Sequence, residues 1–186
     1  IIGAGAAGLM CASKAGKRSR RVVVLDHARK AGNKIRMSGG GRCNFTNYDV
    51  TPAHYLSHNR HFVKSALSRF TQWDFIAMVE RHGILYHERE HGQLFCNDSA
   101  KAILDMLLAE CHAAGVTLRL KTTIETIEQT EEGGFLLHTS QGDYRCESLV
   151  LATGADVSLL DQLGMVERAA PTAVAVRAYV RSPARH

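Results

Sequence analysis

The residues of this chain with the clearest potential for chemistry are three glycines near its start. Gly3, Gly5 and Gly8 form a G-x-G-x-x-G turn directly after Ile1 and Ile2. In such a turn the first glycine permits a tight exit from a strand, the second lets the backbone approach a pyrophosphate, and the third lets the next helix pack closely on the sheet. The N-terminus of that helix presents free N–H groups and a positive dipole to phosphates. The turn therefore predicts dinucleotide binding.

An acidic residue follows at the spacing that a dinucleotide site requires. The apolar run from Val22 to Leu25 ends at Asp26, 23 residues after Gly3. A carboxylate about 20 residues after the glycine turn typically binds a ribose hydroxyl. An acid here favours an unmodified ribose, so FAD or NAD is expected before NADP. The alternative is that Asp26 is a solvated residue at a strand end.

A second candidate region is the glycine-rich, basic stretch between residues 27 and 51. Its core, residues 38–47, contains three consecutive glycines, which predict a turn rather than a helix or strand. Consecutive backbone N–H groups in such a turn can form an anion-binding concavity, and Arg42 and Asn44 add side-chain donors. We expect this loop to face a ligand. Cys43 is either a redox-active thiol or a packing residue, and the sequence favours packing.

Other kinds of site find little support. The five cysteines are widely spaced and include no C-x-x-C pair, which argues against a zinc site, a redox dithiol and a disulfide framework. The ten histidines form no convincing ligand set, so we predict no metal site and leave the catalytic residues unassigned. No apolar stretch approaches the ~20 residues that span a bilayer. We therefore expect a cytoplasmic protein without a membrane association.

The charge distribution raises the question of a nucleic-acid partner. The net charge is +5, and residues 1–70 carry thirteen Lys and Arg against two acids. Such an excess can mark nucleic-acid binding. The basic residues are scattered, however, few aromatics lie between them, and a cofactor phosphate would use the same field. The sequence therefore favours a small-molecule substrate over a nucleic acid, and it predicts no oligomeric state.

The elements that would position these residues alternate between helices and strands, which indicates an α/β fold. We expect a helix over residues 9–15, an amphipathic helix over 60–82, and a third helix from Asp98 or Ser99 to about Ala114. Short strands joined by turns suggest an antiparallel meander on a parallel sheet. The strands are expected at residues 22–25, 84–87, 92–96, 116–120, 123–128, 135–139, 144–146 and 149–154. The last would return beside the first strand and deliver Thr153 and Gly154 to the cofactor crevice.

Several motifs together resemble a known family. They are Gly3 to Gly8, the run from Lys34 to Asn47 with its Met-Ser-Gly-Gly-Gly-Arg-Cys-Asn-Phe-Thr-Asn core, Gly92 to Phe95, and Leu149 to Gly154. With these motifs the chain resembles the BaiN-like NAD(P)/FAD-dependent oxidoreductases, also described as aminoacetone-oxidase-like flavoproteins. The resemblance implies a glutathione-reductase-like, FAD-binding Rossmann-type fold with a parallel sheet and an antiparallel β-meander.

The resemblance also implies a set of FAD-binding residues. The glycine turn, with Ala6 and Ala7, would face the pyrophosphate, and Asp26 with its neighbour His27 would face the adenosine ribose. The backbone near Ile124 would contact adenine, and Thr153 and Gly154 would close over the cofactor. The ribityl and flavin side would be lined by Lys34, Ser38, Gly40, Arg42, Cys43 and Asn44.

The resemblance covers residues 1–154, which we expect to be the FAD-binding domain with a truncated first strand. Residues 155–186 depart from the family pattern and are expected to form a divergent tail. The function implied is flavin-mediated hydride or electron transfer from NAD(P)H to a small organic substrate. The alternative is a non-catalytic nucleotide-binding remnant of a truncated or fused flavoprotein.

Overall fold

The computed structural model describes residues 1–154, 156 and 158–163. The chain divides into two units, Ile1–Ala155 and Asp156–His186. The described part of the second unit contains one short helix, α6 (Ser158–Gln162). The domain boundary at residue 154 and the divergent tail remain predictions, because most of the tail lies outside the described residues.

A small parallel sheet joins the start of the first unit to its end. Strand β1 (Val23–Leu25) pairs in parallel with β5 (Thr117–Arg119). On the other side of β1, Ile2 forms parallel bridges with both Leu25 and Leu151. The order across the sheet is therefore Leu151, Ile2, β1 and β5, which confirms that the last apolar run returns beside the first strand. Ile2 and Leu151 pair as single bridges rather than as extended strands.

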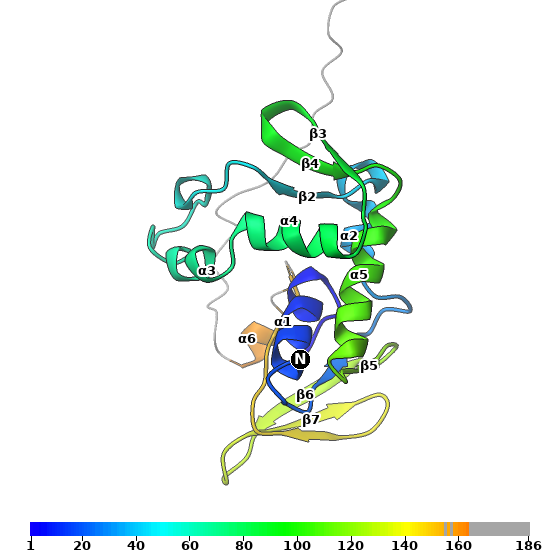
Figure 1. The fold of residues 1–186 in the computed structure, drawn as a ribbon. Coiled ribbons are helices and arrows are strands. Elements are labelled where there is room, and N and C mark those ends of the chain that lie inside the picture. Colours follow the sequence, from blue (N-terminus) through cyan, green and yellow to red (C-terminus); the bar gives the residue numbers. More distant parts are fainter. Residues whose placement is uncertain (155, 157, 164–186) are drawn as a thin grey trace, which may run out of the picture. The chain divides into compact units, whose positions relative to one another are not determined.

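Two long helices lie side by side against this sheet (Figure 1). They are α1 (Ala6–Gly16) and α5 (Ala100–Ala113). Leu9 of α1 and Leu104 of α5 are both almost fully buried in the core that the helices share. The Ser99 hydroxyl caps α5 by accepting the Lys101 N–H at 3.1 Å. Serine is a favoured N-cap residue because its hydroxyl satisfies one of the free N–H groups at the start of a helix.

Two antiparallel sheets complete the first unit. One has the order β2-β4-β3, and the other is the predicted meander, with the order β6-β7-β8. Together with the parallel sheet, the meander confirms the predicted fold class. The bounds are β2 (Asn44–Asn47), β3 (Tyr86–Glu88), β4 (Gln93–Cys96), β6 (Ile124–Gln129), β7 (Phe135–Thr139) and β8 (Tyr144–Cys146), with short 3-10 turns η2 (Pro52–His54) and η3 (Glu90–Gly92).

The single helix predicted over residues 60–82 is wrong. The structure has two helices there, α3 (Lys64–Arg69) and α4 (Gln72–Arg81). Thr71 separates them because it starts α4 with a reciprocal cap: its hydroxyl accepts the Asp74 N–H at 3.2 Å, and the Asp74 carboxylate accepts the Thr71 N–H at 2.7 Å. Such a capping box satisfies backbone donors that a continuous helix would have used differently.

The apolar residues of this region also divide between core and surface. Ile76 and Val79 of α4 are buried, as the amphipathic pattern predicts. Phe62 and Trp73, which the same pattern assigns to the core, are 74% and 55% exposed. The break at Thr71 changes the direction of the chain, so a periodicity counted through it does not describe one helical face.

The glycine-rich loop contains more regular structure than its sequence suggests. It consists of α2 (Asn33–Met37), the turn η1 (Ser38–Gly41) and strand β2. The three glycines have positive φ angles of 56°, 65° and 89°, which only glycine adopts without strain. The glycines therefore form only the turn, and the helix and strand on either side of it were not predicted.

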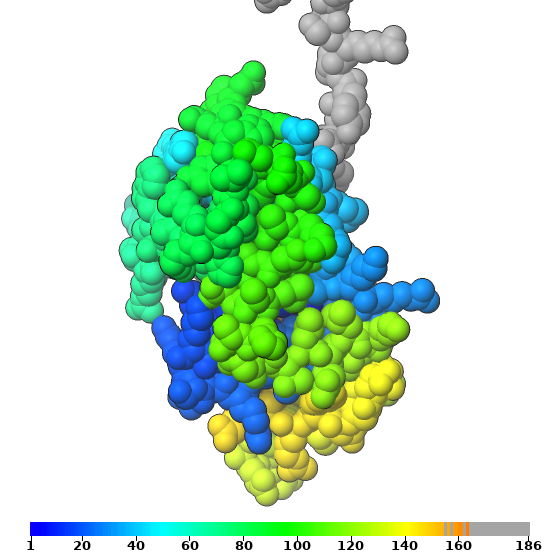
Figure 2. Space-filling view, turned by 45° about the vertical axis from the view of Figure 1, so that its right-hand side comes forward, coloured from blue at the N-terminus to red at the C-terminus, as the bar shows by residue number. Residues whose placement is uncertain are grey.

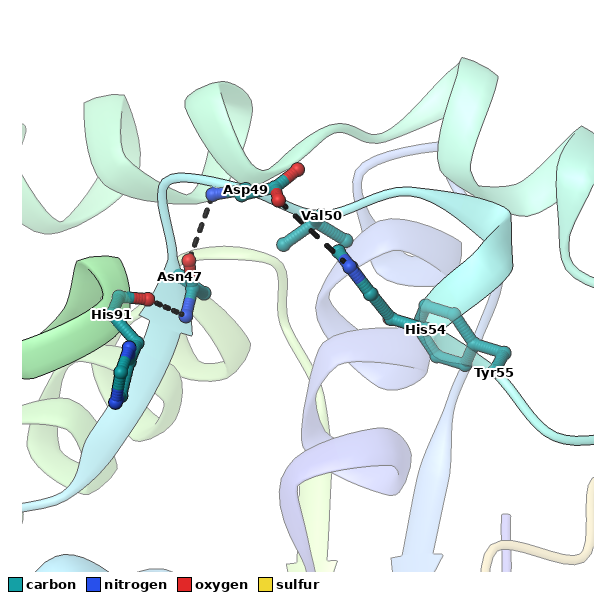
Figure 3. Close-up of a pocket in the computed structure, with 6 residues that line it drawn as sticks. All are labelled: Asn47, Asp49, Val50, His54, Tyr55 and His91. Atoms are coloured by element: carbon teal, nitrogen blue, oxygen red, sulfur yellow. Dashed lines mark hydrogen bonds and ion pairs between the residues drawn. The ribbon is translucent and has the colours of Figure 1, made fainter.

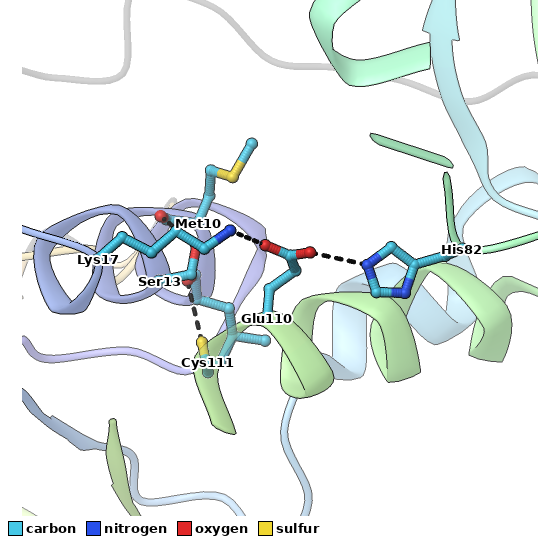
Figure 4. A network of polar contacts seen from close by, with 7 residues as sticks. Met10, Ser13, Lys17, His82, Glu110 and Cys111 are labelled. Carbon is cyan, nitrogen blue, oxygen red and sulfur yellow. Dashed lines mark hydrogen bonds and ion pairs between the residues drawn. The ribbon is translucent and has the colours of Figure 1, made fainter. Parts of the chain in front are cut away.

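A polar network ties three helices together. The Glu110 carboxylate on α5 binds the ammonium of Lys17, just after α1, and lies 2.8 Å from Nε2 of His82, at the end of α4 (Figure 4). Hydrogen bonds from Lys17 and His82 lower the pKa of Glu110 to about 2. Glu110 is therefore ionised at neutral pH and links the ends of these helices. Among the described residues, no helix is long and apolar enough to cross a membrane.

Candidate functional site

The glycine turn uses two of its glycines for close packing and leaves the third facing open space. A Cβ at Gly8 would overlap the carbonyl oxygen of Gly3, and a Cβ at Gly3 would overlap the carbonyl oxygen of Ala152. A Cβ at Gly5 would meet no atom within 4 Å. The turn therefore holds α1 tightly on the sheet while the backbone at Gly5 stays accessible to a ligand.

The first turn of α1 adds exposed backbone to this accessible region. Gly5 is the N-cap residue and makes no side-chain cap hydrogen bond. The next two residues, Ala6 and Ala7, are exposed and carry only a methyl group each. The free N–H groups of a helix N-terminus attract anions. The arrangement thus fits the phosphates of a dinucleotide.

Asp26 lies at the carboxyl end of β1 and supports the glycine turn. Its carboxylate accepts the Ala4 N–H at 2.6 Å and the Ala28 N–H at 2.8 Å. The side chain is 15% exposed, so the solvated alternative does not describe it. His27 is 78% exposed, with Nδ1 3.9 Å from the Asp26 carboxylate. Asp26 therefore fixes the backbone of the turn, and its role toward a ribose stays a prediction.

A cavity of about 390 Å³ brings together five of the predicted cofactor residues, Ala6, Lys34, Ser38, Cys43 and Asn44. Polar groups are few in it, and most of the wall is apolar, which is the usual composition of a cofactor pocket. The lining combines the start of α1 with the glycine-rich loop, α4 and α5. The residues are Ala6, Met10, Lys34, Ile35, Ser38, Cys43, Asn44, Phe45, Phe75, Ile103 and Leu107.

Gly40, predicted on the flavin side, has open space around it, whereas Gly154, predicted to close over the cofactor, lies close to Lys34. Gly40, with a φ of 65°, would have no atom within 4 Å of an added Cβ. Gly154 lies after Leu151 and Thr153 at the edge of the parallel sheet, and an added Cβ would stand 3.3 Å from the Lys34 ammonium. Lys34 therefore reaches from α2 to the segment that returns beside the first strand.

Several predicted residues lie outside this cavity, among them Arg42 and Ile124. Arg42 is exposed, and its carbonyl accepts the Cys96 N–H at 2.9 Å, which joins the glycine-rich loop to β4. Ile124 begins β6 and pairs with Thr139 of β7. The chain just before it donates the Thr122 N–H to the Asp26 carbonyl at 3.0 Å, so this segment borders the Asp26 side of the site rather than the cavity.

Cys43 has the environment of a packing residue. It is 6% exposed and has a φ of 51°, and its N–H donates to the Ser38 carbonyl at 3.1 Å. Burial raises the pKa of the Cys43 thiol above its ordinary value. A thiolate is the reactive form of cysteine, so this environment opposes redox reactivity and supports the packing interpretation.

Sequence reasoning missed a second cavity, of about 470 Å³, at the far end of β2 (Figure 3). Asn47 lies in its wall and connects two neighbouring segments. The Asn47 side-chain nitrogen donates to the His91 carbonyl at 2.8 Å, and its side-chain oxygen accepts the Asp49 N–H at 2.8 Å. His54 Nε2 lies 3.8 Å from the Asp49 carboxylate, and Tyr55 adds an aromatic ring. Within the described residues, no three His, Cys, Asp or Glu side chains gather as a metal site.

The sequence that forms the glycine turn and the parallel sheet matches a known protein family. Residues 1–180 match the family described as "HI0933-like protein Rossmann domain". The chain belongs to the HI0933-like family. The expected resemblance to the BaiN-like flavoproteins is confirmed at the level of this wider family.

Curated relatives of this chain differ in name. A protein of Escherichia coli (strain K12) named ribosomal RNA dihydrouridine synthase is 55% identical over 154 residues, which cover 83% of this chain and 38% of that protein. A protein of the same name from Haemophilus influenzae is 52% identical, over 83% of this chain and 39% of that protein. The 3-dehydro-bile acid delta(4,6)-reductase of Clostridium scindens is 25% identical, over 85% and 39%. This chain thus spans about two fifths of the length of these relatives.

Solved structures confirm the fold at low sequence identity. Glycine oxidase from Geobacillus kaustophilus superposes with a TM-score of 0.56 at 16% identity, over 88% of this chain and 57% of that one. Thermovibrio ammonificans THI4 gives a TM-score of 0.55 at 17% identity, over 87% and 59%. The family match and these superpositions together confirm a Rossmann-type domain.

The predicted partner is wrong. The sequence favoured a small-molecule substrate over a nucleic acid, but both relatives above 50% identity are named for an action on ribosomal RNA. The excess of positive charge in residues 1–70 had been attributed to a cofactor phosphate and discounted because it was scattered along the chain. Scatter in sequence is a weak criterion, since folding can bring distant charges to one surface.

Proposed function

We propose that this chain is the FAD-binding part of a flavoenzyme that reduces uridine in ribosomal RNA to dihydrouridine. The observation that carries the proposal is the 55% identity, over 83% of this chain, to a protein named for that reaction. The glycine turn with open space at Gly5 supports it, because a bound flavin nucleotide needs that approach. The activity belongs to the whole protein, of which this chain corresponds to a part.

The proposed cofactor position follows the described geometry. The pyrophosphate lies over Gly5 and the first turn of α1, and the adenosine lies toward Asp26 and the backbone before Ile124. The flavin side extends along the cavity near Lys34 and Ser38. These assignments use the accessible backbone of the turn and the few polar groups of the cavity wall.

The residues of this chain would bind and orient rather than react. When bound, FAD supplies hydride transfer, which can saturate the C5–C6 double bond of a uracil ring once a proton is added. The Lys34 ammonium would place a positive charge beside the cofactor, and Phe45, Phe75 and Ile103 would exclude water from the cavity. Reduced nicotinamide as the source of electrons remains a prediction.

The experiment that tests the proposal measures cofactor and RNA separately. The purified chain is titrated with FAD, with binding followed by flavin fluorescence, and then with a ribosomal RNA fragment. We expect saturable binding of both. A chain that binds FAD and ignores RNA would support the alternative of a nucleotide-binding remnant. A chain that ignores FAD would refute the cofactor assignment.

A second measurement addresses the reaction itself. The coding region for this chain is expressed in cells that lack dihydrouridine in their ribosomal RNA, either alone or joined to the remaining three fifths of the Escherichia coli relative. Nucleoside mass spectrometry then reads dihydrouridine. The joined protein is expected to restore the modified nucleoside, and a Gly5→Trp version of it is expected not to. Restoration by the Gly5→Trp version would contradict the placement of FAD at the turn.

A further inference from the structure

One exposed segment of the first unit carries apolar and cationic side chains that the cofactor site does not use. This 51–69 segment, from Thr51 to Arg69, comprises η2, a turn and α3. Leu56 is 100% exposed, Phe62 74% and Tyr55 44%. Water solvates such side chains poorly, and an exposed apolar patch with polar residues around it commonly marks an interaction site.

The charge of the 51–69 segment has one sign. It contains Arg60, Lys64 and Arg69 and no Asp or Glu. In the part of the chain that the structure describes, no carboxylate lies within ion-pair distance of these three cations. Among the described residues only Lys17 and Lys101 of the Lys and Arg side chains form ion pairs, so the segment is distinguished by holding three cations and no acid. The segment therefore offers three uncompensated positive charges to an anionic partner.

The segment has local order of its own, which presents these side chains in a defined way. Asn59 organises a turn in which its side-chain oxygen accepts the His61 N–H and its carbonyl accepts the Phe62 N–H, both at 3.0 Å. Ser57 in turn accepts the Asn59 N–H at 3.2 Å. Since Arg60 lies inside this turn, a cation and an aromatic ring are held two residues apart.

An aromatic pair stands at the end of the segment. Trp73, at the start of α4, is 55% exposed and stacks on Tyr48 with ring centroids 5.5 Å apart and planes 25° apart. The Gln72 side chain fixes this corner by donating to the Tyr48 carbonyl at 3.0 Å. A stacked and partly exposed ring is the kind of surface on which an unpaired base can stack.

The segment is continuous with the cofactor cavity through one short strand. Strand β2 begins at Asn44, which lines the cofactor cavity, and ends at Asn47, which lines the second cavity together with Tyr55 of the segment (Figure 3). In Figure 2, residues of the segment, coloured cyan to teal, lie at the margin of the molecule. A long polymer bound to the segment would thus have a path toward the flavin side.

We propose that the 51–69 segment, together with Trp73, binds a single-stranded stretch of the RNA substrate. Phosphates would pair with Arg60, Lys64 and Arg69, and unpaired bases would stack on the exposed rings of the segment and of Trp73. A single strand fits better than a duplex, because a base must leave its stack to expose its faces to aromatic rings or to a reacting centre. This inference rests on the proposed function.

The test measures binding of a fluorescent single-stranded ribosomal RNA fragment over a range of salt concentrations. The charge variant is Arg60→Gln with Lys64→Gln. Its matched control is Arg18→Gln with Arg20→Gln, which removes two exposed cations in the turn between α1 and β1. For a single strand, each phosphate contact contributes about 0.7 to the magnitude of the slope of log binding constant against log salt concentration. The charge variant should therefore reduce the magnitude of that slope by about 1.4, whereas the control should leave it unchanged.

An aromatic variant, Tyr55→Ala with Phe62→Ala, separates stacking from charge. It should weaken binding of the single strand by at least about fivefold, the lower range for one lost stacking contact, and leave the salt slope unchanged. FAD titration of each variant checks that the fold is retained. A duplex of the same sequence should bind more weakly and be insensitive to the aromatic variant.

The outcomes distinguish this inference from the proposed function. If the parent chain binds FAD but no RNA, the proposed RNA function fails. If the parent chain binds RNA and the charge variant behaves like its Arg18 and Arg20 control, the inference fails while the proposed function stands. Equal loss of duplex and single-strand binding in the aromatic variant would overturn the assignment to single strands.

Discussion

Replacing Gly8 by alanine would place a methyl group where the carbonyl oxygen of Gly3 stands. That oxygen belongs to the backbone of a packed turn, so it cannot move aside as the end of a flexible side chain can. Alanine in a helix is otherwise favoured over glycine by about 1 kcal/mol, whereas overpacking costs about 1–3 kcal/mol. Because the obstacle is backbone, we expect the upper end of that range and a net loss of about 2 kcal/mol.

Equilibrium unfolding in urea, followed by far-UV circular dichroism, measures this loss as a lower midpoint with an unchanged m-value. Gly5→Ala is the matched control, because Gly5 has a φ of −88° and an added Cβ would meet nothing within 4 Å. The free energy of unfolding of this control should fall by no more than about 1 kcal/mol, the usual cost of alanine at an N-cap, which is less than the loss expected for Gly8→Ala. Its FAD affinity should nevertheless fall by about tenfold or more, because the methyl group enters the space proposed for the pyrophosphate.

The two substitutions therefore affect different quantities: Gly8→Ala mainly lowers the free energy of unfolding, and Gly5→Ala mainly lowers the affinity for FAD. A Gly8→Ala chain as stable as the parent would refute the argument that close packing at the turn requires glycine. A Gly5→Ala chain that binds FAD as tightly as the parent would refute the placement of the pyrophosphate. Loss of stability in both would show that the turn tolerates no added methyl group.

Three further predictions follow from single side chains. Glu110→Gln should destabilise the protein by about 0.5–1 kcal/mol near neutral pH. Because the pKa of Glu110 is lowered to about 2, the difference in free energy of unfolding from the parent should shrink as the pH falls from about 4.5 toward 2. A difference that grows in acid would contradict this. Ser99→Ala should lower the free energy of unfolding by about 1 kcal/mol through loss of the α5 cap, and Ser99→Asp should retain it in the same urea titration. Cys43 should react slowly with iodoacetamide at neutral pH, because burial raises the pKa of its thiol; rapid alkylation in the folded chain, read by peptide mass spectrometry, would revive the redox interpretation.

The parts of the fold that followed from the sequence are those fixed by backbone requirements. Gly8 must be glycine because no Cβ fits against the Gly3 carbonyl, and the G-x-G-x-x-G motif specifies glycine at this position. The segment at Leu151 returns beside Ile2 because a parallel dinucleotide fold leaves that place open. Ser99 begins α5 because a hydroxyl can satisfy a free helix N–H.

The parts that did not follow depend on competition between local signals. Apolar residues recur at helical spacing through Thr71, yet the capping box between Thr71 and Asp74 ends that continuity. The capping residues are visible in the sequence, but helical periodicity of apolar residues does not detect them. In the same way, the consecutive glycines predict a turn, and that prediction was extended over the flanking residues that form α2 and β2. Both errors came from extending one pattern over neighbouring residues that follow another.

The nucleic-acid partner was discounted in the sequence for a related reason. Counting charges over residues 1–70 mixes the cations of the cofactor loop with those of the 51–69 segment. The absence of acids between Val50 and Phe70 is visible in the sequence, and so are Tyr55 and Phe62. Their exposure is not visible, because the apolar spacing there also fits a buried helical face. The tertiary structure distinguishes the two cases.

The position of Ile2 between Leu25 and Leu151 has a consequence for how the protein is made. The glycine turn is among the earliest of these residues to be synthesised, but one of the two neighbours that hold it arrives only when residue 151 has been added. Contacts between residues so distant in sequence form late, because closing a long loop costs entropy before the contact stabilises it. During synthesis, the strand edge at Ile2 therefore stays unpaired on one side until the segment around Leu151 has been added. The nascent chain carries an exposed strand edge throughout that interval, which is the period of greatest risk for misassembly.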